Sequence, residues 1–243
     1  KMAKVDARND FGETPLYLAA QEGHLGMIRL LIAHGANIHA IPTKGKFTPL
    51  MAATFNHHIE AGYMLIANGA KTDPLSAAGL GLVDAMESAV AKNPGLIPGS
   101  GSALESPLYW AARNGEFRAV YLLAHRKAGL EVKDADMRTP LMVAAMRGHG
   151  SVVRTLIEHG ARINEWDRHG WTALHLAAMH NQPKMAAMLL NNGARGEIKD
   201  LRNRTAADLA REMNNLDVVE TIMEQLEMAA ATRNSNARLT SDK

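Results

Sequence analysis

The chain contains no cysteine among its 243 residues, so disulfide bonds and thiolate metal sites are excluded. Its formal net charge is only +2, which is too small to indicate a nucleic acid or an anionic membrane surface as a partner. No run of eighteen apolar residues is present and no signal peptide is recognisable, so the sequence predicts no membrane span. We expect a monomeric, cytoplasmic protein; the alternative is a secreted or periplasmic protein that has lost a leader.

What the chain does have is one recurring pattern, a Thr, Ser or Asp followed by Pro or Ala and then usually Leu. Its copies begin at residues 14, 48, 73, 106, 139, 172 and 205, so the successive steps are 34, 25, 33, 33, 33 and 33. A fixed period near 33 indicates stacked structural repeats, each of which packs on its neighbours. Such solenoids present long surfaces rather than pockets, so we expect binding rather than catalysis.

The clearest repeat spans residues 134–166. Thr139 and Pro140 suit the start of a helix, because Thr caps the first turn and Pro lacks only an N–H that would be unpaired there. Gly148 suits the end of this first helix, and Gly160 the end of a second helix, because glycine adopts the left-handed turn easily. The residues that follow read as an extended finger leading into the next repeat.

This pattern resembles the ankyrin repeat, as in Thr14-Pro15-Leu16-Tyr17-Leu18-Ala19-Ala20 and Thr172-Ala173-Leu174-His175-Leu176-Ala177-Ala178. The resemblance implies an all-α solenoid of about seven helix pairs with short β-hairpin fingers. We place an ankyrin-repeat domain at residues 1–230, with repeats starting near 9, 43, 73, 101, 134, 167 and 200, and a disordered tail at 231–243. Residues 2–8 resemble the end of an earlier repeat, so the array either continues upstream or begins with a strand.

The step of 25 residues marks an irregular region at 70–105. After Lys71 and Thr72 the next helix is expected to begin at once, at Asp73-Pro74, so one finger is missing. We interpret the third repeat as degenerate, with helices over 75–80 and 83–92. The alternative is an insertion at residues 76–100 between ordinary repeats.

No catalytic, cofactor-binding or metal-binding residue is expected. The sequence has no phosphate loop, nucleophile elbow, His-Glu-x-x-His motif or calcium loop, so we predict a protein that is not an enzyme and needs no cofactor. Most of the eleven histidines recur in equivalent repeat positions, which favours structural roles. The resemblance implies that the His175 ring makes a hydrogen bond to a finger.

Binding residues are expected at the finger tips and at the ends of the first helices, which in ankyrin repeats form one concave face that usually binds protein. These positions hold Trp, Arg and Met, residue types suited to interfaces. They are Asp136, Arg138, Met146, Arg147, Trp166, Arg168, His169, Trp171, Met179 and His180, with Phe47 and Phe55 as a second group. Alternatively, Trp166 and Trp171 only pack across their finger, and for Trp110 packing and binding both remain open.

We therefore predict a protein-binding scaffold, adaptor or inhibitor. A more specific alternative is a bacterial ankyrin protein that neutralises or targets a partner enzyme. An alternative of another class is nucleic-acid or anionic-ligand binding through the basic residues Arg168, Arg195, Lys199, Arg202, Arg204 and Arg211. This alternative lacks interleaved stacking aromatics, so nucleic acid is not expected.

Overall fold

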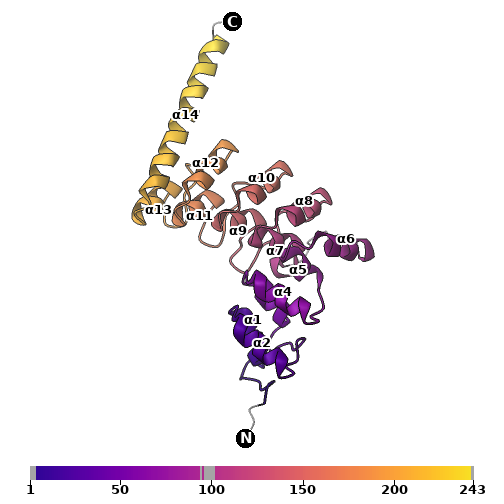
Figure 1. Cartoon of the computed structure of the whole chain (residues 1–243). Coiled ribbons are helices and arrows are strands. Elements are labelled where there is room, and N and C mark those ends of the chain that lie inside the picture. Colours follow the sequence, from indigo (N-terminus) through magenta and orange to yellow (C-terminus); the bar gives the residue numbers. More distant parts are fainter. Residues whose placement is uncertain (1–3, 94, 96–101, 242–243) are drawn as a thin grey trace.

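The computed structural model describes residues 4–93, 95 and 102–241, the last ten of them by their backbone alone. Its helices are α1 (Pro15–Gln21), α2 (Leu25–Ala33), α3 (Pro49–Phe55), α4 (Ile59–Ala67), α5 (Pro74–Gly79), α6 (Val83–Lys92), α7 (Pro107–Asn114), α8 (Phe117–His125), α9 (Pro140–Met146), α10 (Gly150–Glu158), α11 (Ala173–Met179), α12 (Pro183–Asn191), α13 (Ala206–Glu212) and α14 (Leu216–Ser241), with a 3-10 turn at η2 (Ala103–Glu105). They pack as successive pairs in one row (Figure 1). The predicted all-α solenoid is confirmed.

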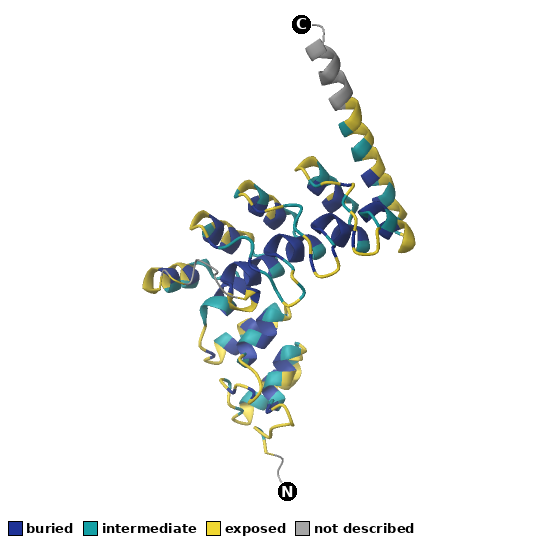
Figure 2. Ribbon diagram, turned by 180° about the vertical axis from the view of Figure 1, so that it is seen from behind, coloured by how far each residue is buried: buried dark blue, intermediate teal, exposed yellow. Residues whose placement is uncertain are grey.

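The helices begin where the sequence predicts, for the expected reason. The hydroxyls of Thr14, Thr48 and Thr139 each accept a hydrogen bond from the backbone N–H three residues later, and a proline follows each cap. The first helix of each pair lies inside the row and is mostly buried, whereas the second helix leaves one face exposed (Figure 2). Stacking of these inner helices forms the core.

The last three fingers are built by one aspartate each, at Asp134, Asp167 and Asp200. In each finger Oδ1 accepts hydrogen bonds of 2.8 to 3.0 Å from the backbone N–H groups two and four residues later. The aspartate N–H donates to the carbonyl four residues later, at 2.8 to 3.1 Å. No β-strand is present in the described residues, so these fingers are hairpin turns without a strand ladder.

Neighbouring fingers are joined through their backbones. The N–H of Arg168 donates to the carbonyl of Asp136 at 3.0 Å, and the N–H of Leu201 donates to the carbonyl of His169 at 3.1 Å. The finger tips therefore form a continuous, hydrogen-bonded row along this half of the array.

The third repeat has no finger before its first helix, as the spacing predicts. Helix α5 begins at Pro74, directly after the cap Asp73, and packs between α3 and α7. A Cβ on Gly79 would lie 2.6 Å from Thr54 Cγ2, so glycine permits the close approach of α5 and α3. Figure 1 shows that the row changes direction between α4 and α5.

Because Gly79 places no side chain between its neighbours and the third repeat has no finger, side chains of the second and fourth repeats meet across α5. Trp110 on α7 contacts Phe47 and Phe55 with ring centroids 5.3 and 5.2 Å apart, and Phe47 and Phe55 are 5.6 Å from each other. We call these three rings the aromatic bridge. Trp110 is buried and donates its Nε1–H to the Leu104 carbonyl, so its role is packing. Phe47 and Phe55, expected on a binding surface, pack here and keep only part of each ring exposed.

Polar contacts strengthen the same junction. The amide of Asn114 donates to the carbonyls of Thr54 and Gly79, both at 2.8 Å, and Arg113 Nε donates to the Phe55 carbonyl at 2.8 Å. The fourth repeat is thus bonded directly to the second as well as to the third.

The last helix differs from expectation. The tail predicted to be disordered from residue 231 continues α14 as far as Ser241, and residues 242–243 lie outside the described part. The physical reason is that residues 216–241 contain no glycine or proline to end the helix. Val218 and Ile222 bury one face of α14 on the array. No described helix is both long and apolar enough to cross a membrane.

Candidate protein-binding surface

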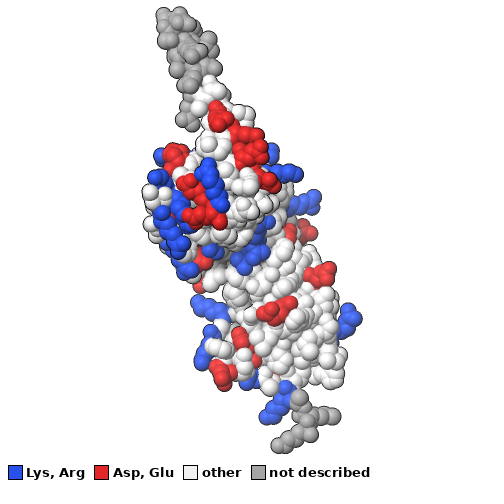
Figure 3. Space-filling model, turned by 90° about the vertical axis from the view of Figure 1, so that its left-hand side faces the viewer, with Lys and Arg blue, Asp and Glu red and all other residues white. Residues whose placement is uncertain are grey.

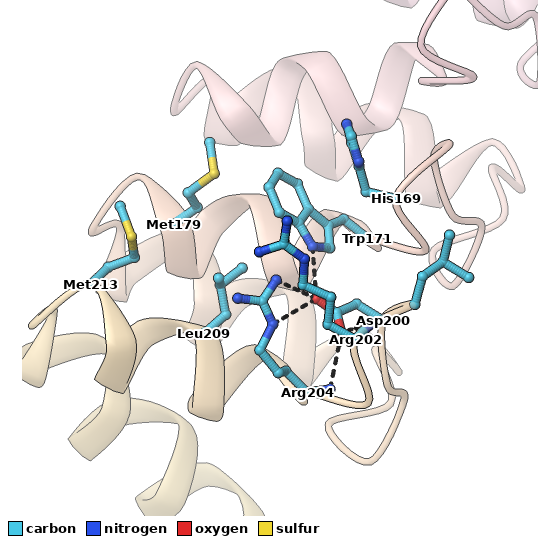
Figure 4. Close-up of a pocket in the computed structure, with 9 residues that line it drawn as sticks. His169, Trp171, Met179, Asp200, Arg202, Arg204, Leu209 and Met213 are labelled. Atoms are coloured by element: carbon cyan, nitrogen blue, oxygen red, sulfur yellow. Dashed lines mark hydrogen bonds and ion pairs between the residues drawn. The ribbon is translucent and has the colours of Figure 1, made fainter.

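The structure brings three of the predicted binding residues, His169, Trp171 and Met179, into one groove of about 450 Å³. The groove lies between the fingers and first helices of the last two repeats (Figure 4). Its other lining residues are Asp200, Leu201, Arg202, Arg204, Leu209 and Met213. Leu201 and Met213 were not predicted as binding residues, although they occupy finger-tip and helix-end positions that the repeat period would have identified.

Trp171 forms one wall of this groove. Its Nε1–H donates to Asp200 Oδ2 at 3.0 Å, and its ring centroid lies 5.0 Å from that of His169. The side chain is half-buried and packs against the core, so it is neither fully buried nor free. The fixed indole of Trp171 and the side chains of Met179 and Met213 together give the groove an apolar lining of defined shape (Figure 4).

The carboxylate beneath Trp171 is held ionised. Burial raises the pKa of Asp200, but hydrogen bonds from Arg204, Trp171 and the backbone outweigh it and keep the pKa well below its usual range. Arg204 contacts Asp200 Oδ2 through Nε at 3.0 Å and through Nη2 at 2.7 Å. A bidentate arginine of this kind fixes the finger on which Trp171 depends.

Large apolar side chains are exposed in the groove and next to the finger that carries Trp171. Trp166 is 59% exposed and makes no hydrogen bond or ring contact with any residue that the structure describes. Leu201 is 78% exposed and Met213 52% exposed. Trp166 is therefore mostly exposed, and large exposed apolar side chains of this kind typically mark an interaction site.

A second feature of this face is a row of methionines. Met146, Met179 and Met213 lie at the ends of three successive first helices, α9, α11 and α13. We call them the methionine row. Met146 and Met179 are partly exposed, and flexible thioether side chains adapt to partners of different shape.

The remaining predicted residues are distributed differently. Asp136 holds Arg168 at 2.9 Å and Arg138 at 3.2 Å, so these finger residues form an ionic link between neighbouring repeats. Arg147 and His180 lie at the ends of α9 and α11, where Arg147 is half-buried and His180 is exposed.

The basic residues of the nucleic-acid alternative are largely paired. Arg168, Arg195, Arg204 and Arg211 contact Asp136, Glu197, Asp200 and Asp208, respectively. Figure 3 shows acidic and basic side chains intermixed on the face it displays. This pairing neutralises much of the positive charge that a phosphate backbone would require.

His175 occupies a structural position, as the repeat pattern predicts. His175 is buried; Nε2 contacts the Arg204 carbonyl at 3.1 Å, and Nδ1 lies 3.3 Å from the Thr172 backbone nitrogen and 3.0 Å from its hydroxyl. The predicted bond from His175 to a finger is confirmed. Among the described residues, no three metal-binding side chains lie close enough to hold an ion.

Comparison with known proteins assigns the repeats to a family. A family model described as ankyrin repeats (3 copies) matches residues 1–75 and 108–200. The unmatched stretch between them contains most of the third repeat, whose first helix is short and lacks a finger.

Individual relatives match over parts of their length only. The chain is 31% identical to an ankyrin repeat and KH domain-containing protein, mask-1, of Caenorhabditis elegans over 142 residues, which is 56% of this chain and 5% of that protein. It is 43% identical over 51 residues to the NF-kappa-B inhibitor cactus of Drosophila melanogaster, covering 21% of this chain and 10% of the relative. It is 38% identical over 73 residues to human neurogenic locus notch homolog protein 2, covering 30% of this chain and 3% of the relative.

Proposed function

Because the chain belongs to the ankyrin repeat family, whose fold serves in general for protein–protein interaction, we propose that it binds a partner protein. The binding surface we propose consists of the finger tips and first-helix ends of the last three repeats. It includes the groove beside Trp171, the exposed Trp166 and the methionine row.

The observation that carries this proposal is the apolar groove with large exposed side chains at its rim. Stacking explains the buried residues of the first helices, but it does not explain Trp166 or Leu201, which contribute little to the core and cost solubility. Trp171 is already held in place by Asp200, so little side-chain entropy would be lost when a partner packs against its ring. A rigid aromatic anchor next to flexible methionines is a common hot-spot arrangement.

Within this function, the chain acts as a scaffold, an adaptor or an inhibitor. The inhibitor role has one specific support, since the relative cactus is by its name an inhibitor of another protein. Neutralisation or targeting of a partner enzyme by a bacterial ankyrin protein is the narrower version of the same proposal. We propose that the chain acts as a cytoplasmic monomer without a cofactor.

The experiment has two steps. A partner is first captured from the native lysate with the immobilised chain and identified by mass spectrometry. Its Kd is then measured by calorimetry for the parent, Trp171→Ala and Trp166→Ala chains. We expect Trp171→Ala to weaken binding by about 2 kcal/mol, roughly thirty-fold, as for a typical aromatic hot spot.

The matched control is Phe117→Ala. Phe117 is 45% exposed, but it lies on the outer helix α8, away from the groove. Its truncation should leave the Kd unchanged. Circular dichroism should show unchanged helicity in all variants. If Trp171→Ala and Trp166→Ala bind as tightly as the parent, the partner does not use this surface.

A further inference from the structure

Four basic groups from three repeats gather in the middle of the same face. Arg113 ends α7, Arg147 follows α9, and His57 and His149 lie in the turns that precede α4 and α10. The His57 and His149 rings are 6.4 Å apart, and His149 Nε2 contacts the Arg113 carbonyl at 3.2 Å. The third repeat allows this approach, because it brings the second repeat next to the fourth, and His149 of the fifth repeat lies against Gly115 of the fourth.

The two guanidinium groups have no acidic partner within the described part of the chain. All ion pairs found there, up to 4.0 Å, involve other residues. Arg147 Nε is buried and has no hydrogen-bond partner among the residues that the structure describes. Burial, and to a lesser degree the charge of Arg113, lower the pKa of Arg147.

This arrangement is unfavourable for the isolated chain. A half-buried charge without a partner loses hydration, and a second positive charge nearby adds repulsion. Arg138, Arg168 and Arg204 on the same face are instead matched with carboxylates of the chain. The contrast indicates that the missing negative charge comes from outside the chain.

We propose that Arg113 and Arg147 bind a carboxylate side chain, Asp or Glu, of the partner segment that lies along this face. This inference rests on the proposed function and specifies its partner. Arg113 uses Nε for the Phe55 carbonyl and stacks over the Phe55 ring at 4.2 Å, which leaves its terminal nitrogens for a further acceptor. Terminal nitrogens of a fixed guanidinium suit a two-point contact with a carboxylate.

The surroundings favour a protein carboxylate over a nucleic-acid phosphate. The arginine pair is a single site bordered by Phe55 and Met146, rather than part of a basic stripe that could follow a phosphate backbone. Arg138, Arg168 and Arg204 of the same face are paired with carboxylates, and the formal net charge of the chain is only +2.

The fold also sets the spacing within the partner segment. Packed helices lie about 8–10 Å apart, so the distance from α9 to α13 is about 20 Å. An extended peptide covers this distance in about six residues. We therefore expect an acidic residue at the arginine pair and a bulky apolar residue at the Trp171 groove, about six residues apart.

The test uses fluorescein-labelled hexaglutamate and hexaglutamine as probes, with Kd measured by anisotropy at low ionic strength. Hexaglutamate should bind at least ten-fold more tightly than hexaglutamine. The Arg113→Gln, Arg147→Gln double variant should lose this preference. The control variant Arg118→Gln, Arg154→Gln removes two exposed arginines from the outer helices α8 and α10 and should keep it.

The single variant Arg147→Gln separates binding from folding. Because Arg147 Nε has no partner in the described part of the chain, its replacement should leave the Tm unchanged or raise it while hexaglutamate affinity falls. A Tm lowered by several degrees would show a structural role and overturn the proposal. Equal binding of the two peptides, or binding unaffected by the double variant, would also overturn it.

Two further outcomes are decisive. If a twelve-residue oligouridylate binds the arginine pair more tightly than hexaglutamate does, the site recognises nucleic acid and the proposal is wrong. If hexaglutamate binding depends on the arginine pair but partner binding is unaffected by Trp171→Ala and Trp166→Ala, the charged site stands and the proposed groove function fails.

Discussion

Replacing Trp110 with alanine should uncouple the first two repeats from the others. Trp110 is 1% exposed and is the one ring of the aromatic bridge contributed by the fourth repeat. Truncating a buried Trp costs about 3–5 kcal/mol, which here includes its contacts with Phe47 and Phe55. Loss of its hydrogen bond to the Leu104 carbonyl contributes about 1 kcal/mol of this total.

The loss should be local because repeats couple to their neighbours only. Hydrogen exchange followed by mass spectrometry in increasing urea should show α1–α4 losing protection at a lower urea concentration than α7–α13. The matched control is Leu174→Ala on α11, which removes an equally buried side chain from the other half. It should destabilise the protein by about 2–5 kcal/mol without selectively exposing α1–α4.

A double-mutant cycle between Trp110→Ala and Phe55→Ala measures the contact itself. We expect a coupling energy of about 0.5–1.5 kcal/mol between these rings. Equal loss of protection in both halves of the Trp110→Ala chain, or a coupling energy near zero, would refute the reasoning that this bridge holds the second and fourth repeats together.

Two further predictions concern hydrogen bonds. Asn114→Ala leaves the Thr54 and Gly79 carbonyls without their donor and should lower the free energy of unfolding, measured in urea, by about 1–3 kcal/mol. Asn114→Asp should lower it further at pH 7, and an Asp variant as stable as the parent would contradict this. Burial lowers the pKa of His175 and outweighs the opposite effect of its bond to the Arg204 carbonyl. The neutral ring therefore stabilises the fold above a pH of about 6.5, and this contribution is lost as the pH falls toward the lowered pKa of the folded state. The drop in Tm from pH 7.5 to 5.0 should therefore be smaller in His175→Gln, and an unchanged drop would argue against it.

The repeat period predicts the helix pairs, their caps and the missing finger, because each depends on residues close in sequence. The period also identifies Trp171 and Met179, which share a groove. It does not predict the aromatic bridge or the approach of His57 to His149, because both depend on how thin the third repeat is. That thickness follows from the missing finger and from Gly79, whose lack of a side chain lets Thr54 and Asn114 approach from either side, and a motif search does not measure such contacts.

The helical tail and the groove residues Leu201 and Met213 show a different reason for incomplete prediction. A polar composition suggested disorder after residue 230, whereas the absence of Gly and Pro allows α14 to continue. Leu201 and Met213 belong to the last repeat, and the sequence alone does not show that they line a groove shared with the repeat before it.

The construction of the fingers has a consequence for how specificity can evolve. Asp134, Asp167 and Asp200 fix each turn, and the bonds between neighbouring tips use backbone atoms. The tip side chains between these anchors are therefore under few folding constraints. On the proposed surface, substitution of the tip residue Arg202 should therefore change partner recognition at little risk to stability, whereas Arg168 also links its finger to Asp136 of the preceding repeat, so Arg202 is the better position for a randomised binding library.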